Sequence, residues 1–133
     1  MDYQEFVTTQ FIPRVLAALN AMRDTLIAAG VSANRITVGE VDATNLRYRI
    51  TTVRGSRTLV AYFELTPVGI IDGEMSLVIT LYVEGNGSEI THSYTVGLPQ
   101  RYITDLDTLL AKLTSAELTM GEVTVKARAF LQV

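Results

Sequence analysis

The sequence predicts an α+β fold: a long N-terminal helix and C-terminal helices packed on one face of a five-stranded antiparallel meander sheet. Three observations lead to this prediction. Apolar residues recur every three or four positions over the first thirty residues, which is typical of an amphipathic helix. The apolar period changes to two between Ile36 and Leu98, which is typical of strands, and helix-start signals return after Thr104. With 133 residues, 48% of them hydrophobic and 19% charged, the chain fits one domain over residues 1–133.

The predicted N-terminal helix carries a single apolar stripe, which indicates one buried face. The residues of this stripe are Ile12, Val15, Leu16, Leu19, Met22, Leu26 and Ile27. Pro13 removes one helical hydrogen bond, so we expect a kink or a break near Phe11–Pro13. Gly30 favours the left-handed conformation that commonly ends a helix, and we expect the helix to stop there.

Five runs rich in Val, Ile, Thr and Tyr follow, and turn signals separate them, which predicts the strands of the meander. The runs are Ile36–Val41, Leu46–Val53, Thr58–Thr66, Glu74–Glu84 and Glu89–Val96. The turn signal Gly55-Ser56 fits a two-residue hairpin loop. That loop pairs Tyr48 with Phe63, and a slip of one residue would move both to the other face.

The dipeptide Asn86-Gly87 is the second hairpin signal, because Asn-Gly suits a type I′ turn. A two-residue loop at this place pairs Leu81 with His92 and Ile79 with Tyr94. Both pairs then lie on the apolar face of the predicted sheet.

A helix is predicted over residues 104–113. Asp105 and Asp107 stand near its start and Lys112 near its end, which is the arrangement that the helix dipole favours. It is the first of the predicted C-terminal helices.

Residues 115–131 fit two interpretations. Their apolar residues alternate near the end, as in a strand, but they also follow a helical spacing. Thr114 and Glu117 have the spacing of a capping box, which favours a helix. Gly121 is the weak point of that helix, because glycine has a low helix propensity.

Composition excludes several classes of function. The chain has no cysteine and one histidine, so disulfides, thiol nucleophiles and cysteine-based metal sites are excluded, and we expect no metal and no cofactor. A net charge of -3 does not suit a nucleic-acid partner. No apolar run approaches the roughly 18 residues of a membrane span. The acidic N-terminus does not resemble a secretory signal, so we expect a bacterial-type cytoplasmic protein.

His92 is the one histidine available for catalysis. The predicted register places it on the apolar face, while its neighbour Ser93 points to the opposite face, so the two side chains cannot form a nucleophile–base pair. We therefore expect a structural role for His92 and no catalytic residues in this chain.

The polar face of the predicted sheet is the candidate functional surface. It combines Tyr, Val, Thr and Arg and lacks Lys, a composition that is typical of protein–protein contacts. The candidate interface residues are Arg49, Val60, Tyr62, Val78 and Tyr82. We expect a non-enzymatic protein-interaction module that forms a homodimer or binds a protein partner through this face.

Two structural alternatives compete with an interface: residues 115–133 fold back over this face, or the face is an ordinary exposed sheet. The alternative function is the binding of a small ligand in a pocket between the N-terminal helix and the sheet. That pocket would lie near Tyr48, Phe63, His92 and Tyr94.

Overall fold

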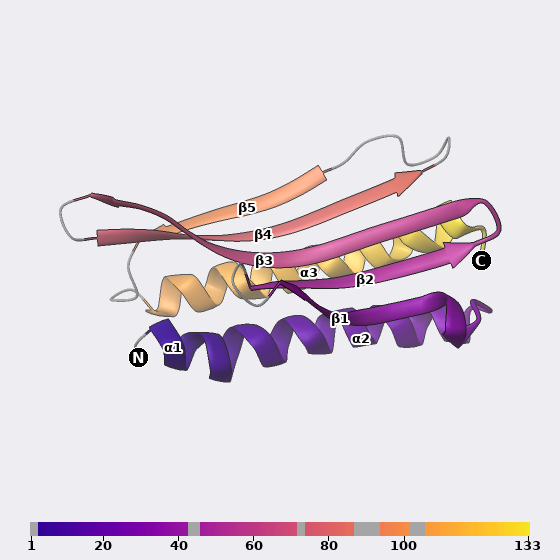
Figure 1. Cartoon of the computed structure of the whole chain (residues 1–133), viewed down its shortest axis with the longest axis horizontal. Helices are drawn as coiled ribbons and strands as arrows, with labels where there is room; N and C mark the ends of the chain where they lie inside the picture. Colours follow the sequence, from indigo (N-terminus) through magenta and orange to yellow (C-terminus); the bar gives the residue numbers. More distant parts are fainter. Residues whose placement is uncertain (1–2, 43–45, 72–73, 87–93, 102–105) are drawn as a thin grey trace.

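The computed structural model describes residues 3–42, 46–71, 74–86, 94–101 and 106–133. It has two layers, with the sheet in one and both long helices in the other (Figure 1). The helical elements are α1 (Tyr3–Phe6), the π-helical turn η1 (Val7–Phe11), α2 (Ile12–Ala28), the 3-10 turn η2 (Ala33–Arg35) and α3 (Leu106–Leu131). The strands are β1 (Ile36–Asp42), β2 (Arg47–Arg54), β3 (Arg57–Ile71), β4 (Glu74–Asn86) and β5 (Tyr94–Arg101).

The strands follow one another in the sheet in the order β1-β2-β3-β4-β5, each antiparallel to its neighbours. The predicted α+β class is confirmed, as an antiparallel sheet with an N-terminal and a C-terminal helix. Both α2 and α3 lie on the same side of this sheet (Figure 1). The core forms between the two layers, where side chains from α2, α3 and the inward positions of β2, β3 and β4 are buried.

The helix does not break near Phe11–Pro13 as predicted, because Phe11 and Ile12 both keep right-handed helical backbone angles. The chain forms a π-helical turn over Val7–Phe11 immediately before α2, and the Ile12 N–H donates to the Val7 carbonyl. Pro13 follows this π-turn directly and lacks the N–H that would donate to a carbonyl of the preceding turn. The irregular hydrogen bonding of the helix therefore lies next to the proline.

The predicted stop at Gly30 is confirmed. Gly30 has a φ of 117° and its N–H donates to the Ile27 carbonyl at 3.0 Å, while the Val31 N–H donates to the Leu26 carbonyl at 3.0 Å. These two bonds form a Schellman motif, and the buried side chains of Val31 and Leu26 supply its usual apolar contact. The motif turns the chain from α2 towards β1.

The Gly55-Ser56 hairpin has the predicted register. Tyr48 pairs with Phe63, and Gly55 takes a φ of 61°, which glycine adopts without strain. Here the turn signal and the apolar alternation of the two strands specify the same pairing.

The predicted pairing across Asn86-Gly87 is wrong. Val83, and not Ile79, pairs with Tyr94, while Leu81 pairs with Val96 in place of His92. The register is thus displaced by four residues. Leu81 is fully buried, and an apolar partner in the strand suits such a position better than an imidazole, so core formation outweighs the preference of Asn-Gly for a tight turn.

The C-terminal region is one helix and not several, so the prediction of separate C-terminal helices is wrong. α3 runs without a break through residues 115–131, which excludes the strand interpretation of that segment. Its buried stripe keeps one phase along the whole helix and contains Leu109, Leu113, Ala116, Met120, Val123, Ala127 and Phe130. Packing of this stripe outweighs the roughly 1 kcal/mol that a mid-helix glycine costs at Gly121.

An ion pair joins the two helices. The Arg14 guanidinium on α2 contacts the Glu117 carboxylate on α3 and donates to the Thr114 hydroxyl at 2.9 Å. α3 is therefore held on the helix side of the sheet, and the alternative in which residues 115–133 cover the other face is wrong.

Thr52 provides a test of this core. Its side chain is fully buried, and its hydroxyl has no hydrogen-bond partner among the residues that the structure describes. Because a buried unpaired hydroxyl loses its hydration without compensation, Thr52→Val should raise the free energy of unfolding by about 1 kcal/mol. Urea denaturation measures the change. Thr51→Val, on the opposite face of the sheet, is the matched control and should change the free energy of unfolding by less than about 0.5 kcal/mol. A Thr52→Val protein that is less stable than the wild type would contradict this description of the core.

Candidate functional site

The face of the sheet that points away from the helices carries the candidate site, and we call it the outer sheet face. Its side chains alternate along each strand with the buried ones and are half-buried or exposed. Its described residues on β2, β3 and β4 include Arg47, Arg49, Thr51, Val60, Tyr62, Glu64, Val78, Thr80 and Tyr82. None of the helices that the structure describes lies over this face (Figure 1).

The predicted interface residues fall into a central row and two flanking positions. Arg49, Tyr62 and Tyr82 are register partners across β2, β3 and β4, so they form one row. Val60 is two residues from Tyr62 along β3, whereas Val78 is four residues, or about 13 Å, from Tyr82 along β4. The structure therefore brings four of the five together and places Val78 further along the face.

Tyr62 and Tyr82 form a stacked pair at the centre of the row. Their ring centroids lie 4.9 Å apart with 25° between the ring planes. The Tyr82 hydroxyl donates to Glu84 Oε2 at 2.8 Å, two residues along the same strand. The stack and this hydrogen bond hold both rings in fixed orientations.

Arg47 adds a cation to the tyrosine stack. Its guanidinium carbon lies 4.5 Å from the centroid of the Tyr62 ring, within cation–π distance. Arg47 Nε donates to Glu64 Oε2 at 2.7 Å, and the Thr66 hydroxyl donates to Glu64 Oε1 at 2.8 Å. Both oxygens of the carboxylate are thus engaged, and the guanidinium is held over the ring.

Arg47 is absent from the predicted interface residues, which name Arg49 as the cation of this row. Arg49 is the direct register partner of Tyr62, but Arg47, on the diagonal, lies over the ring. Diagonal neighbours across antiparallel strands lie within reach of long side chains, and that rule could have identified Arg47 from the predicted register.

The charges around Tyr62 change its acidity. Burial raises the pKa of the Tyr62 phenol above its ordinary value, Arg47 acts to lower the pKa, and the carboxylates of Glu64 and Glu84 act to raise it. The pKa of Arg47 is also raised, chiefly by its hydrogen bond to Glu64. Tyr62 is therefore a neutral hydrogen-bonding and stacking group at neutral pH.

The residues of the predicted small-ligand pocket lie elsewhere. Tyr48 is 5% exposed and Phe63 is fully buried, and both belong to the core cluster. Tyr94 pairs with Val83 through its backbone, and His92 lies outside the described residues. The binding of a small ligand at this place stays a prediction.

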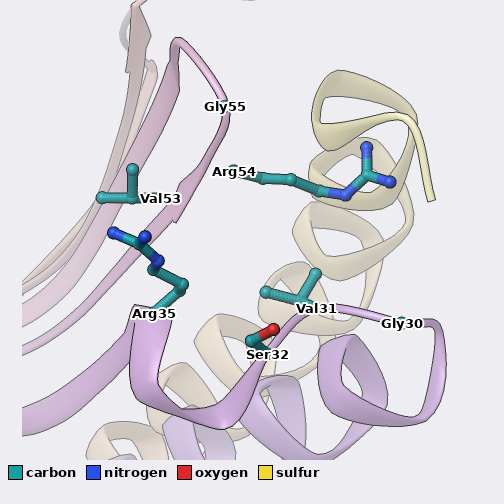
Figure 2. Close-up of a pocket in the computed structure, with 7 residues that line it drawn as sticks. All are labelled: Gly30, Val31, Ser32, Arg35, Val53, Arg54 and Gly55. Carbon is teal, nitrogen blue, oxygen red and sulfur yellow. The ribbon is translucent and has the colours of Figure 1, made fainter.

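One pocket of about 270 Å³ lies where α2, η2 and the β2–β3 turn meet (Figure 2). It is lined by Gly30, Val31, Ser32, Arg35, Val53, Arg54 and Gly55. Arg54 extends towards the end of α3, where it donates to the Leu131 carbonyl at 2.8 Å, whereas Arg35 extends along the sheet side of the pocket. The two guanidinium groups do not converge, and Arg54 serves to cap the C-terminus of α3.

Among the residues that the structure describes, no group of three or more His, Asp and Glu side chains is placed to hold a metal ion. In the same part of the chain, no helix combines the length and apolar character that a membrane span requires.

The acidity of Tyr62 provides a test of the Arg47 contact. Arg47→Gln removes the positive charge that favours the phenolate, so the pKa of Tyr62 should rise further and the phenol should ionise at higher pH than in the wild type. The ultraviolet absorbance of the phenolate, measured as the difference from a Tyr62→Phe protein, follows this titration. An unchanged or lower pKa in Arg47→Gln would show that the guanidinium does not lie over the ring.

Comparisons with known proteins identify no relatives: no family model, no curated protein and no solved structure matches this chain.

Proposed function

We propose that this protein is a non-enzymatic interaction module that associates with a second copy of itself through the outer sheet face. The observation that carries the proposal is the stack of Tyr62 on Tyr82 with Arg47 over it, on a face that no described helix covers. Tyr and Arg are enriched at the centres of protein interfaces and among the residues that contribute most binding energy.

The arrangement of these side chains supports binding. Arg47, Tyr62 and Tyr82 are already ordered by their contacts with Glu64, Glu84 and each other. Side chains that are ordered before association lose less conformational entropy when a partner arrives. The face therefore presents a preformed surface of aromatic and charged groups.

The distribution of charge favours a second copy as the partner. Arg49 on β2 is exposed and forms no ion pair with the residues that the structure describes, while the exposed Glu84 lies on β4, on the other side of β3. A two-fold axis parallel to β3 places β2 of each copy opposite β4 of the other. Each Arg49 then approaches Glu84 of the second copy at the rim of the contact, where opposite charges attract without full loss of hydration.

The size of the face is sufficient for a specific contact. With strands about 4.8 Å apart and about 3.3 Å per residue, the sheet from β1 to β5 and the eight residues of β2 define an area of roughly 500 Å². Two copies would bury about 1,000 Å² in total, which is the lower limit for a specific interface. We therefore expect an association in the micromolar range.

Substitution of the stacked tyrosines tests the proposal. Tyr62→Glu combined with Tyr82→Glu places four carboxylates at the centre of a two-fold contact, so the contact should be lost while the fold remains. Sedimentation equilibrium should show a lower mass than for the wild type at the same concentration, and circular dichroism should show an unchanged fold. Asn34→Glu with Ser56→Glu, two exposed positions away from the face, is the charge-matched control. A wild type that sediments at 14.6 kDa at tens of micromolar would overturn the proposal.

A further inference from the structure

Tyr62 and Tyr82 are the accessible side chains that lose an electron most readily, among those that the structure describes. The chain has no cysteine and no tryptophan, so the tyrosine phenol is its most easily ionised side chain in a one-electron oxidation. Tyr48 is 5% exposed, whereas Tyr62 and Tyr82 are half-buried on the outer sheet face. Met22 and Met120 are at most 2% exposed, and methionine reacts chiefly by taking up an oxygen atom.

Glu84 gives the phenol proton of Tyr82 a place to go. A phenol that loses an electron becomes strongly acidic, so its oxidation is easier where a base stands within hydrogen-bond reach. The Tyr82 hydroxyl donates to Glu84 Oε2 at 2.8 Å, and Glu84 is exposed. The carboxylate can therefore take the proton as the electron leaves and release it to water.

Tyr62 is placed to react with a radical on Tyr82. The two residues are direct register partners on β3 and β4, and their ring centroids lie 4.9 Å apart with 25° between the ring planes. Arg47, from β2 on the other side of β3, lies over the Tyr62 ring and holds it in place. The unpaired electron of a phenoxyl radical resides partly on the carbons ortho to the oxygen. Because the side chains of such a cross-strand pair start close together, a small rotation brings the ortho carbons of the two rings to bonding distance.

We propose that Tyr62 and Tyr82 form an oxidative cross-linking site, at which a one-electron oxidant joins the two rings by a carbon–carbon bond. Two equivalents of the oxidant are reduced: one takes an electron from each phenol, and both hydroxyl protons leave, that of Tyr82 through Glu84. The two phenoxyl radicals couple at their ortho carbons, and each ring then moves its ortho hydrogen to its oxygen and becomes a phenol again. The chain thus loses two hydrogen atoms, as two protons and two electrons.

The new bond would tie β3 to β4 on the outer sheet face. It closes a loop of the chain that contains the turn between these strands, and a cross-link of this kind restricts the unfolded chain, as a disulfide does. The cross-linked chain should therefore unfold at a higher temperature than the unmodified one. Both rings belong to one chain, so this inference does not depend on the self-association proposed above.

Photo-oxidation of the full chain tests the site. Light, a ruthenium(II) tris-bipyridyl complex and persulfate supply the one-electron oxidant, at a protein concentration below the micromolar range so that chains react singly. We expect a product with the mass of one chain less two hydrogen atoms, with the fluorescence of dityrosine and a raised melting temperature. Proteolysis should give two peptides joined through Tyr62 and Tyr82. A single-chain product joined through other residues, or no such product, would refute the proposal.

Three variants and a control examine the roles of the individual side chains. Tyr62→Phe and Tyr82→Phe each keep an aromatic ring but lack one phenol, so the cross-linked product should be absent from both. Glu84→Gln keeps a hydrogen-bond acceptor that does not take the proton, and it should slow the cross-linking several-fold. Glu122→Gln, which removes an exposed carboxylate on α3, is the matched control and should react at the rate of the wild type. A product that persists in Tyr82→Phe would refute the site, and a Glu84→Gln protein that reacts as fast as the wild type would refute the transfer of the proton to Glu84.

Discussion

The structure depends on one constraint: both long helices bury their apolar stripes against the same face of the sheet. Leu19 and Met22 of α2 and Leu113 and Met120 of α3 are at most 2% exposed, and the core closes between the layers. The ion pair of Arg14 with Glu117 joins the two helices. Because both long helices lie on one side, no helix in the described part of the chain covers the outer sheet face.

The outer sheet face holds its side chains by specific polar contacts, as in the engagement of Glu64 by Arg47 and Thr66. Aromatic and charged groups that are held in this way favour selective recognition. The outward side of α3 differs, because its exposed apolar residues Leu118 and Val125 lie among exposed charged residues such as Glu122 and Lys126.

The parts of the fold that the sequence predicts correctly are those at which local and long-range signals agree. At Gly55 the turn chemistry and the alternation of the strands specify one register, and at Gly30 the glycine follows the apolar stripe closely.

The Asn86-Gly87 prediction failed because a period of two does not distinguish registers that differ by four residues. Gly121 has a low helix propensity, but α3 continues through this position because its buried stripe packs on the core. The contact of Arg47 with Tyr62 depends on side-chain reach along a diagonal, which alternation alone does not encode.

The central claim is that self-association covers the stacked tyrosines, and the ring signals of individual tyrosines in nuclear magnetic resonance spectra test it most directly. Tyrosine-to-phenylalanine variants assign the signals, and the protein is diluted stepwise from millimolar to low micromolar concentration. The account predicts that the ring signals of Tyr62 and Tyr82 shift on dilution, while those of Tyr48, which is 5% exposed in the core, stay constant. Signals of Tyr62 and Tyr82 that remain constant over the whole range would contradict it.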